Sequence, residues 1–312
     1  MTRTCGILVV VFLLCISSTV SNAVDIEMVE VGNPGNVSDD DGNGTVSYVY
    51  EIGKYEITVS QYAEFLNAVA KQDTNGLYNE SMDTRCGITR EGNELEYSYV
   101  VQSEYSNKPI SYVNLVDACR FVNWLQNKQP TGAQDETTTE SGTYQFNIDG
   151  TVIFPNERNG FALPTFDEWY KAAYHYNDGS SEGYYTYPGT DEYYDEMANV
   201  GKVHKDTFDV DSYELQSFYG THCQLGNVAE IIEYLYDNDD FCGTCGKNFN
   251  SEADTCGSEN TLTITALFSH TSNIGFRVAK LPEPISAGIW GVFAGALLVR
   301  RRHRQWTPGR DH

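Results

Sequence analysis

Three short amphipathic segments, each preceded by a capping residue, are the features of this sequence that most constrain its fold. They follow Thr58, Asn114 and Thr165. Gln61 and Glu168 stand three residues after the two threonines, which is the capping-box spacing. Apolar residues then recur at intervals of three and four in each segment, so one face of each is apolar. The pattern predicts three helices.

Long loops are expected between and after these helices. Residues 177–225 are rich in Tyr, Gly and Asp and contain only short apolar runs. Such sequence favours short strands and long ordered loops over regular layers. Loops of this length must be held by side-chain hydrogen bonds or bound ions. The 22 tyrosines can supply the hydrogen bonds, because each carries a polar hydroxyl on an apolar ring.

The N-terminal 23 residues have the order of parts of a secretory signal peptide. Arg3 provides a positive start, Ile7–Ile16 is an apolar run, and Ser21-Asn22-Ala23 supplies small residues for cleavage. The run is shorter than the about 20 residues that a membrane span requires. We therefore expect residues 1–23 to be a signal peptide, with an N-terminal anchor as the alternative.

Residues 281–304 combine a Pro-Glu-Pro triplet, an apolar run and an arginine cluster. This order resembles the PEP-CTERM sorting signal of some Gram-negative bacteria. The resemblance implies recognition by an exosortase, cleavage near the triplet and delivery to the cell surface. The segment would also contact the membrane before processing, and a simple tail anchor is the alternative. The residues of the signal would be Pro282, Glu283, Pro284, Arg300, Arg301 and Arg302.

The charge of the chain excludes one class of partner. The formal net charge is -24, and residues 24–280 hold 14 of the 20 basic and 42 of the 44 acidic residues. Phosphate backbones repel such a surface, so general nucleic-acid binding is excluded. The charge suits an exterior protein that meets divalent cations, but the usual meaning of such charge is a solvated surface.

Six cysteines remain after the signal peptide, and three of them lie close together at Cys242, Cys245 and Cys256. The Cys-x2-Cys spacing is typical of zinc sites, but a second matched pair is missing. Disulfides persist outside the cytoplasm, so pairing among these three cysteines, or with Cys223, is the other interpretation. The spacing alone leaves the two open.

Five sequence blocks resemble the formylglycine-generating enzyme, or sulfatase-modifying factor, family. They read YEIGKYEITVSQYAEFLNAV, NKPISYVNLVDACRFVNWL, FALPTFDEWYKAAYHYN, LGNVAEIIEY and NIGFRVAK, and they occur in family order between Tyr50 and Lys280. The resemblance implies one α+β domain over residues 24–280, related to C-type lectins. It would be loop-rich, with short twisted sheets and about three helices. Gly275-Phe276-Arg277 would end a core strand.

Enzymes of this family oxidise a sulfatase cysteine to formylglycine, using O2 and a Cu(I) ion held by two thiolates. In the family, the two cysteines follow a turn that residues 246–249 resemble here. Counting from this turn assigns Ser251 and Cys256 to the two thiolate positions. A hydroxyl is a poor Cu(I) ligand, so one member of the pair is lost. The resemblance thus implies a catalytically silent domain. The alternatives are a retained oxidase, or a copper site rebuilt from Cys245 and Cys256.

Structural calcium is the other cofactor that the resemblance implies. Carboxylate and carbonyl oxygens suit this hard cation. A first site would use Asn199, Val200, Asp211 and Tyr213, and a second would use Gly226, Val228 and Glu230. The second site is weakened by Cys223, which replaces an oxygen ligand, so we expect Ca²⁺ at one site.

Two classes of function follow from these expectations. The first is a catalytically silent surface module that binds an unidentified protein or glycan, and the second is a formylglycine-generating oxidase. The serine at position 251 and the sorting tail favour the first.

Overall fold

The computed structural model describes residues 23–194, 197–201, 204–236, 240–252 and 257–283. The expected signal peptide and most of the expected sorting segment lie outside these residues. Pro282 and Glu283 are described and follow the last strand. None of the described helices is long and apolar enough to cross a membrane.

The described residues form four α-helices and two 3-10 helices, listed here by their bounds: α1 (Val59–Val69), α2 (Ser81–Arg85), α3 (Leu115–Gln126), α4 (Phe166–Tyr174), η1 (Ser103–Tyr105) and η3 (Ser258–Asn260). The three helices expected from the sequence are α1, α3 and α4. The additional helix, α2, is only five residues long, buries only Met82 and has no side-chain cap, so no periodic pattern marked it.

The predicted caps of the three longer helices are confirmed. Thr58 Oγ1 accepts a hydrogen bond from Gln61 N at 3.2 Å, and Gln61 Oε1 accepts one from Thr58 N at 2.9 Å. Thr165 and Glu168 make the same reciprocal pair at α4. Asn114 caps α3 as expected, and its box is closed by Asp117, which the sequence reading did not include. These bonds satisfy backbone N–H groups that lack partners inside a helix.

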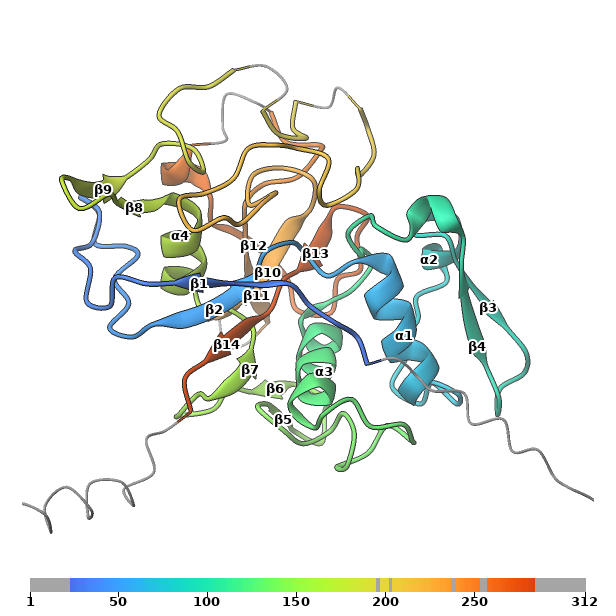
Figure 1. The fold of residues 1–312 in the computed structure, drawn as a ribbon. Helices are drawn as coiled ribbons and strands as arrows, with labels where there is room; N and C mark the ends of the chain where they lie inside the picture. The colour runs from blue at the N-terminus through green and yellow to red at the C-terminus, as the bar shows by residue number, and fades with distance from the viewer. Residues whose placement is uncertain (1–22, 195–196, 202–203, 237–239, 253–256, 284–312) are drawn as a thin grey trace, which may run out of the picture.

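One antiparallel sheet joins the two ends of the domain. Its strand order is β1-β2-β14-β7, so the first and the last described strands lie in the same sheet. Figure 1 shows β2 and β14 side by side, with β14 close to the end of the described chain. The strands are β1 (Met28–Val31), β2 (Tyr50–Gly53), β7 (Gly160–Ala162) and β14 (Ala279–Leu281).

A second sheet has the order β12-β11-β10-β13, in which only the β10–β13 pair is parallel. Its strands are β10 (Ala229–Tyr236), β11 (Phe241–Cys245), β12 (Thr263–Ala266) and β13 (Ile274–Phe276). The expectation that a core strand ends near Arg277 is confirmed, because β13 ends one residue earlier.

Three two-stranded hairpins complete the described strands. They are β3 (Ile88–Glu91) with β4 (Ser98–Val101), β5 (Gln145–Phe146) with β6 (Val152–Ile153), and β8 (His175–Asn177) with β9 (Glu182–Tyr184). Short sheets, four helices and long loops make this an α+β fold, as expected.

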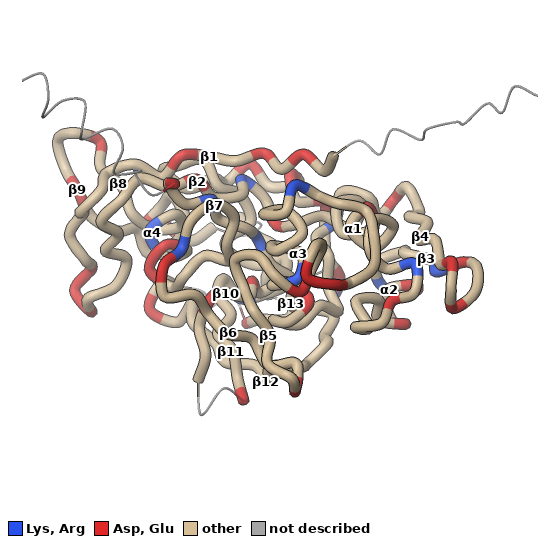
Figure 2. The backbone as a smooth tube through the Cα atoms, turned by 90° about the horizontal axis from the view of Figure 1, so that it is seen from below, with Lys and Arg blue, Asp and Glu red and all other residues tan. Residues whose placement is uncertain are grey.

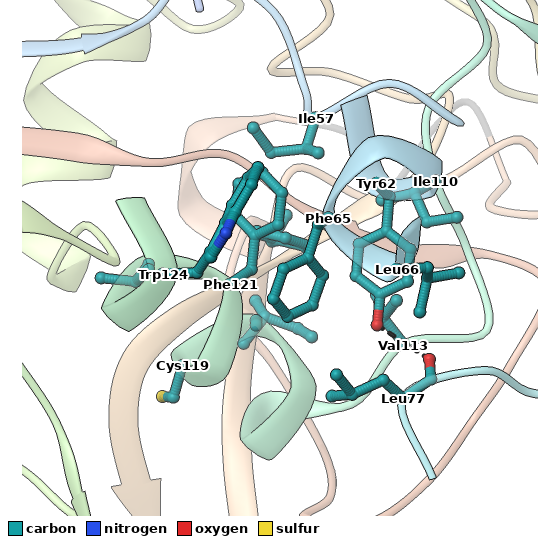
Figure 3. Close-up of a cluster of buried hydrophobic side chains, with 14 of the residues drawn as sticks. Ile57, Tyr62, Phe65, Leu66, Leu77, Ile110, Val113, Cys119, Phe121 and Trp124 are labelled. Atoms are coloured by element: carbon teal, nitrogen blue, oxygen red, sulfur yellow. Dashed lines mark hydrogen bonds between the residues drawn. The ribbon is translucent and has the colours of Figure 1, made fainter. Parts of the chain in front are cut away.

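The main core lies between α1, α3 and β13. Phe121 contacts Phe65 and Phe276 edge-on, with ring centroids 5.3 and 5.4 Å apart, and Trp124 packs 5.3 Å from Phe65. Figure 3 shows these helix side chains pointing toward one another, and Tyr62 donating its hydroxyl to the Leu77 carbonyl at 2.9 Å. Aromatic pairs at these separations add to the stabilisation that burial of apolar surface provides.

Acidic residues are spread over many elements of the domain, whereas the fewer Lys and Arg residues are scattered among them (Figure 2). The described elements therefore carry both signs of charge, with the acidic residues in excess.

Candidate functional site

Ser251 lies in a layer of three loops that backbone hydrogen bonds tie together. Gly201 N donates to the Ser251 carbonyl at 2.8 Å, and Gly226 N donates to the Gly246 carbonyl at 2.7 Å. Asn227 N completes the layer by donating to the Asn199 carbonyl at 2.9 Å. A side chain at Gly226 would place its Cβ 2.4 Å from that same carbonyl oxygen, so glycine is required for this close approach.

The Ser251 side chain forms a hydrogen bond within its own turn. Its Oγ accepts a hydrogen bond from Asn248 N at 3.1 Å, and its backbone N donates to the Asn248 carbonyl at 2.9 Å. Lys247 adopts a left-handed conformation with φ 61°, at a position where glycine is the usual choice. A hydroxyl held in this way is a hard, neutral ligand and does not fit Cu(I). Cys256, the other expected ligand, lies outside the described residues.

Cys242 and Cys245 do not form a metal-binding pair. Both lie on β11, and residues three apart on a strand point to opposite faces. Cys242 packs into the main core, whereas Cys245 packs with Trp169, Tyr174 and Ile232. No group of three or more His, Cys, Asp or Glu residues in the described chain could hold a metal ion. The zinc interpretation of the Cys-x2-Cys spacing is therefore wrong.

Burial also keeps these thiols protonated. It raises the pKa of the Cys242 thiol to about 12 and the pKa of the Cys245 thiol well above its ordinary value. Since the thiolate is the form that binds Cu(I), Cys245 is a poor replacement for the missing ligand. Cys223, Cys242 and Cys245 are free, so the expected pairings among these three are absent. Any pairing with Cys256 falls outside the described part of the chain.

The first expected calcium site retains one feature of a cation site. Asn199 is buried, and its Oδ1 has no hydrogen-bond partner among the described residues, although its Nδ2 donates to the Asp206 carbonyl at 2.9 Å. A buried oxygen without a donor is costly, and a bound cation would satisfy it. Val200 is buried beside it, and Asp211 is exposed and accepts from Asn107 Nδ2. The Tyr213 carbonyl faces His222 Nδ1 at 3.0 Å.

The second expected calcium site does not fit, because a buried arginine already binds both oxygens of the Glu230 carboxylate. Glu230 lies on β10, has no exposed surface and pairs with Cys245 of β11. Val228, two residues earlier in the chain, is also buried. Its Oε2 accepts from Arg277 Nε at 2.5 Å and from Trp169 Nε1 at 2.7 Å, and its Oε1 accepts from Arg277 Nη2 at 2.6 Å. A cation at Glu230 would compete with the Arg277 guanidinium for this buried carboxylate. We therefore correct this assignment: Glu230 is the partner of a buried arginine.

Sequence reasoning missed Glu56, a buried carboxyl next to this ion pair. Asn227 Nδ2 donates to its Oε1 at 3.2 Å, and its Oε2 has no partner among the described residues. Desolvation first and the Glu230 charge second raise its pKa to about 8, and Arg277 opposes both. Glu56 is thus largely protonated at neutral pH. The only sequence signal was an acid between Tyr55 and Ile57, just before the cap at Thr58.

An open hollow of about 580 Å³ lies beside the Asn199 loop. Aromatic and apolar side chains line much of it, including Phe208, Tyr213, Leu215 and Met197. Figure 1 places the loops of this region together at one end of the domain, above β8 and α4 in that view.

Comparison with known proteins agrees with this fold. The structure called "Crystal Structure of CarF" aligns with a TM-score of 0.59 at 21% identity, over 83% of this chain and 99% of that one. "Treponema denticola variable protein 1" aligns with a TM-score of 0.55 at 19% identity, over 83% and 96%. At these identities the likeness concerns the fold alone. No curated protein matches the chain.

A match to a protein family covers most of the sequence. Residues 30–282 match the family described as "Sulfatase-modifying factor enzyme 1-like domain". The match includes the capped helices, nearly all of both four-stranded sheets and the Ser251 loop. This chain therefore belongs to the sulfatase-modifying factor family.

Proposed function

We propose that this family member is an exported, surface-sorted module that has no oxidase activity and binds a partner protein or glycan. The observation that carries the proposal is Ser251. A hydroxyl that accepts from Asn248 N occupies the position at which the family resemblance expects a thiolate. The remaining candidate thiol on the described chain, Cys245, is buried and protonated. Paired thiolates for Cu(I) are therefore not available from described residues.

Export and sorting are supported by the ends of the sequence. Arg3 and the apolar run after it suit a signal peptide, and the Pro-Glu-Pro triplet with its arginine cluster suits exosortase processing. Structural Ca²⁺ at the Asn199 loop would replace the missing donor at Asn199 Oδ1. The ion would hold together the loops around Ser251, and we assign it no part in a reaction.

The test is an oxidase assay on the full chain. The protein is incubated with Cu(I), O2 and a peptide that contains the Cys-x-Pro-x-Arg sequence, and aldehyde formation is followed by mass spectrometry. An active family oxidase serves as the positive control. We expect no conversion above the rate without protein. Copper-dependent conversion of the peptide would favour the alternative function, a formylglycine-generating oxidase.

A further inference from the structure

A second cleft, of about 560 Å³, lies far from the Ser251 loops and has a different chemistry. It is formed by the end of α3, the β5–β6 hairpin and the loop that leads to β7. In Figure 1 these elements lie at the bottom of the domain, whereas the loops around Ser251 lie at the top. We call it the carboxamide cleft, because five of its lining residues are Gln126, Asn127, Gln145, Asn156 and Asn159.

Two of these carboxamides are held in fixed orientations by the fold. Gln126 Oε1 accepts from Phe161 N at 2.9 Å, and no described residue accepts from its NH2 group. Asn127 Nδ2 donates to the Thr138 and Ser141 carbonyls at 2.9 and 2.7 Å, which uses both of its hydrogens and leaves Oδ1 as an acceptor. The end of α3 thus offers a fixed donor on Gln126 and a fixed acceptor on Asn127, and both residues line the cleft.

The backbone is adapted to this arrangement at Gly160. Its φ is 62°, and a Cβ there would lie 2.3 Å from Gln126 Oε1. Any larger residue would push the Gln126 side chain away from Phe161 N. The glycine therefore maintains the position of the Gln126 amide.

The other three carboxamides are free to bind a ligand. Gln145 and Asn156 are exposed, and Asn159 is half-buried. None of the three side chains hydrogen-bonds to another described residue. Each offers one acceptor and two donors. A half-buried aromatic ring, Phe154, forms part of the wall and packs 5.8 Å from Tyr144.

The charge of the cleft is low for this protein. Among its lining residues only Glu157 is ionisable, although the chain as a whole has a net charge of -24. A cation would find one carboxylate, and an anion would find no basic group. The lining instead matches a ligand that is neutral and both donates and accepts hydrogen bonds at many points.

We propose that the carboxamide cleft binds a neutral carbohydrate chain. Sugar hydroxyls donate and accept at the same atom, which suits a cleft that holds both the donor of Gln126 and the acceptor of Asn127. The polarised C–H face of a sugar ring can lie against the negative face of Phe154. The volume is in the usual range for small-ligand sites. This inference rests on the glycan-binding part of the proposed function, to which it gives a site, and does not depend on whether the Ser251 loop is catalytically silent.

The experiment uses the full chain with cellohexaose, maltohexaose and mannohexaose as neutral probes and trigalacturonic acid as an anionic probe. Side-chain amide resonances of Gln126 and Asn127 are followed by NMR, and affinities are measured by calorimetry. We expect at least one neutral probe to shift these resonances, and trigalacturonic acid to leave them unchanged. No shift with any neutral probe, or a stronger effect of the anionic one, would overturn the proposal.

A matched pair of variants then locates the binding site. The triple variant Gln145→Ala/Asn156→Ala/Asn159→Ala removes the three free carboxamides and should raise Kd at least about tenfold, since each lost hydrogen bond costs roughly 1 kcal/mol. The control Gln72→Ala/Gln102→Ala/Asn250→Ala removes three exposed carboxamides elsewhere and should leave Kd unchanged. Equal loss in both variants would contradict the proposal. If the first variant does not fold, the resonance shifts of the unmodified protein decide alone.

The oxidase assay tests catalytic silence independently of these binding measurements. Carbohydrate binding with peptide oxidation would refute catalytic silence only, and silence without carbohydrate binding would refute this inference only.

Discussion

Arg277 and Glu230 form a bidentate ion pair in which neither side chain is exposed to solvent. The pair joins adjacent elements of the second sheet, because Glu230 lies on β10 and Arg277 directly follows β13. The remaining donors of Arg277 reach the Gly53 carbonyl at 2.9 Å and the His222 carbonyl at 2.8 Å. One guanidinium therefore connects both four-stranded sheets with the loop layer that holds Ser251.

Replacing this arginine should cost far more than replacing an exposed one. Arg277→Met leaves Glu230 buried without its cation, and we expect a loss of about 3–5 kcal/mol in the free energy of unfolding. Lys280→Met is the control, because its ion pair with Glu51 is about half exposed and should contribute less than about 1 kcal/mol. Urea unfolding of both variants gives the comparison. Similar losses in the two would show that the buried pair has no special role.

Glu56 should make the stability of the domain depend on pH. Its folded pKa is raised to about 8 from the ordinary 4.5, so the folded protein retains a proton that the unfolded chain releases between these values. Stability should therefore fall as pH rises through this window, with a slope of up to about 1.4 kcal/mol per pH unit. Glu56→Gln, which mimics the protonated form, should remove this part of the slope.

Urea unfolding at several pH values from 5 to 8 measures the effect. Glu51→Gln serves as the control, because it removes a half-exposed carboxylate from the neighbouring strand β2. It should leave the slope as it is in the unmodified protein. A Glu56→Gln variant with an unchanged slope would mean that Glu56 is ionised in the folded protein.

The helices were the most predictable part of the fold, because their signals are local. A cap at Thr58 and an apolar residue every three or four positions are both contained within one short segment. The same holds for Asn114 and Thr165. The short helix α2 has neither signal, since its position depends on the contacts of Met82 with the surrounding core.

The site was less predictable, because its key relationships are long-range. Glu230 was expected to be a calcium ligand, but Arg277, 47 residues away in sequence, occupies its carboxylate. Cys242 and Cys245 have the spacing of zinc ligands, but strand geometry sends them to opposite faces. The spacing of two residues in a motif does not by itself show that their side chains can meet. The backbone conformation between them must also be known.

Removal of calcium should destabilise the protein if the Asn199 loop binds it as proposed. A ligand that binds only the folded state at 100 times its Kd adds about 2.7 kcal/mol. For a domain of this size, a chelator should then lower Tm by about 5–10 °C. Differential scanning calorimetry with and without EDTA measures this shift.

Two carboxylate variants identify the site. Asp211→Asn should reduce the EDTA effect, because it weakens an expected ligand. Glu214→Gln alters a nearby exposed carboxylate and should retain the full effect. A Tm that is insensitive to EDTA in the unmodified protein would remove calcium from the proposal without affecting the copper argument.

Restoring the missing thiol should create a copper site. Ser251→Cys would place a soft ligand at the position that the family resemblance assigns to one of two thiolates, with Cys256 as the other. We expect the affinity for Cu(I) to rise at least about tenfold in competition with a chromogenic Cu(I) chelator, because thiolates prefer this ion and hydroxyls do not.

Ser103→Cys adds an exposed thiol far along the chain and should produce no such gain. In the double variant Ser251→Cys/Cys256→Ser the gain should disappear. A gain that persists in this double variant, or no gain in Ser251→Cys itself, would show that Ser251 and Cys256 do not occupy the two ligand positions, and the case for a silent domain would lose its main support.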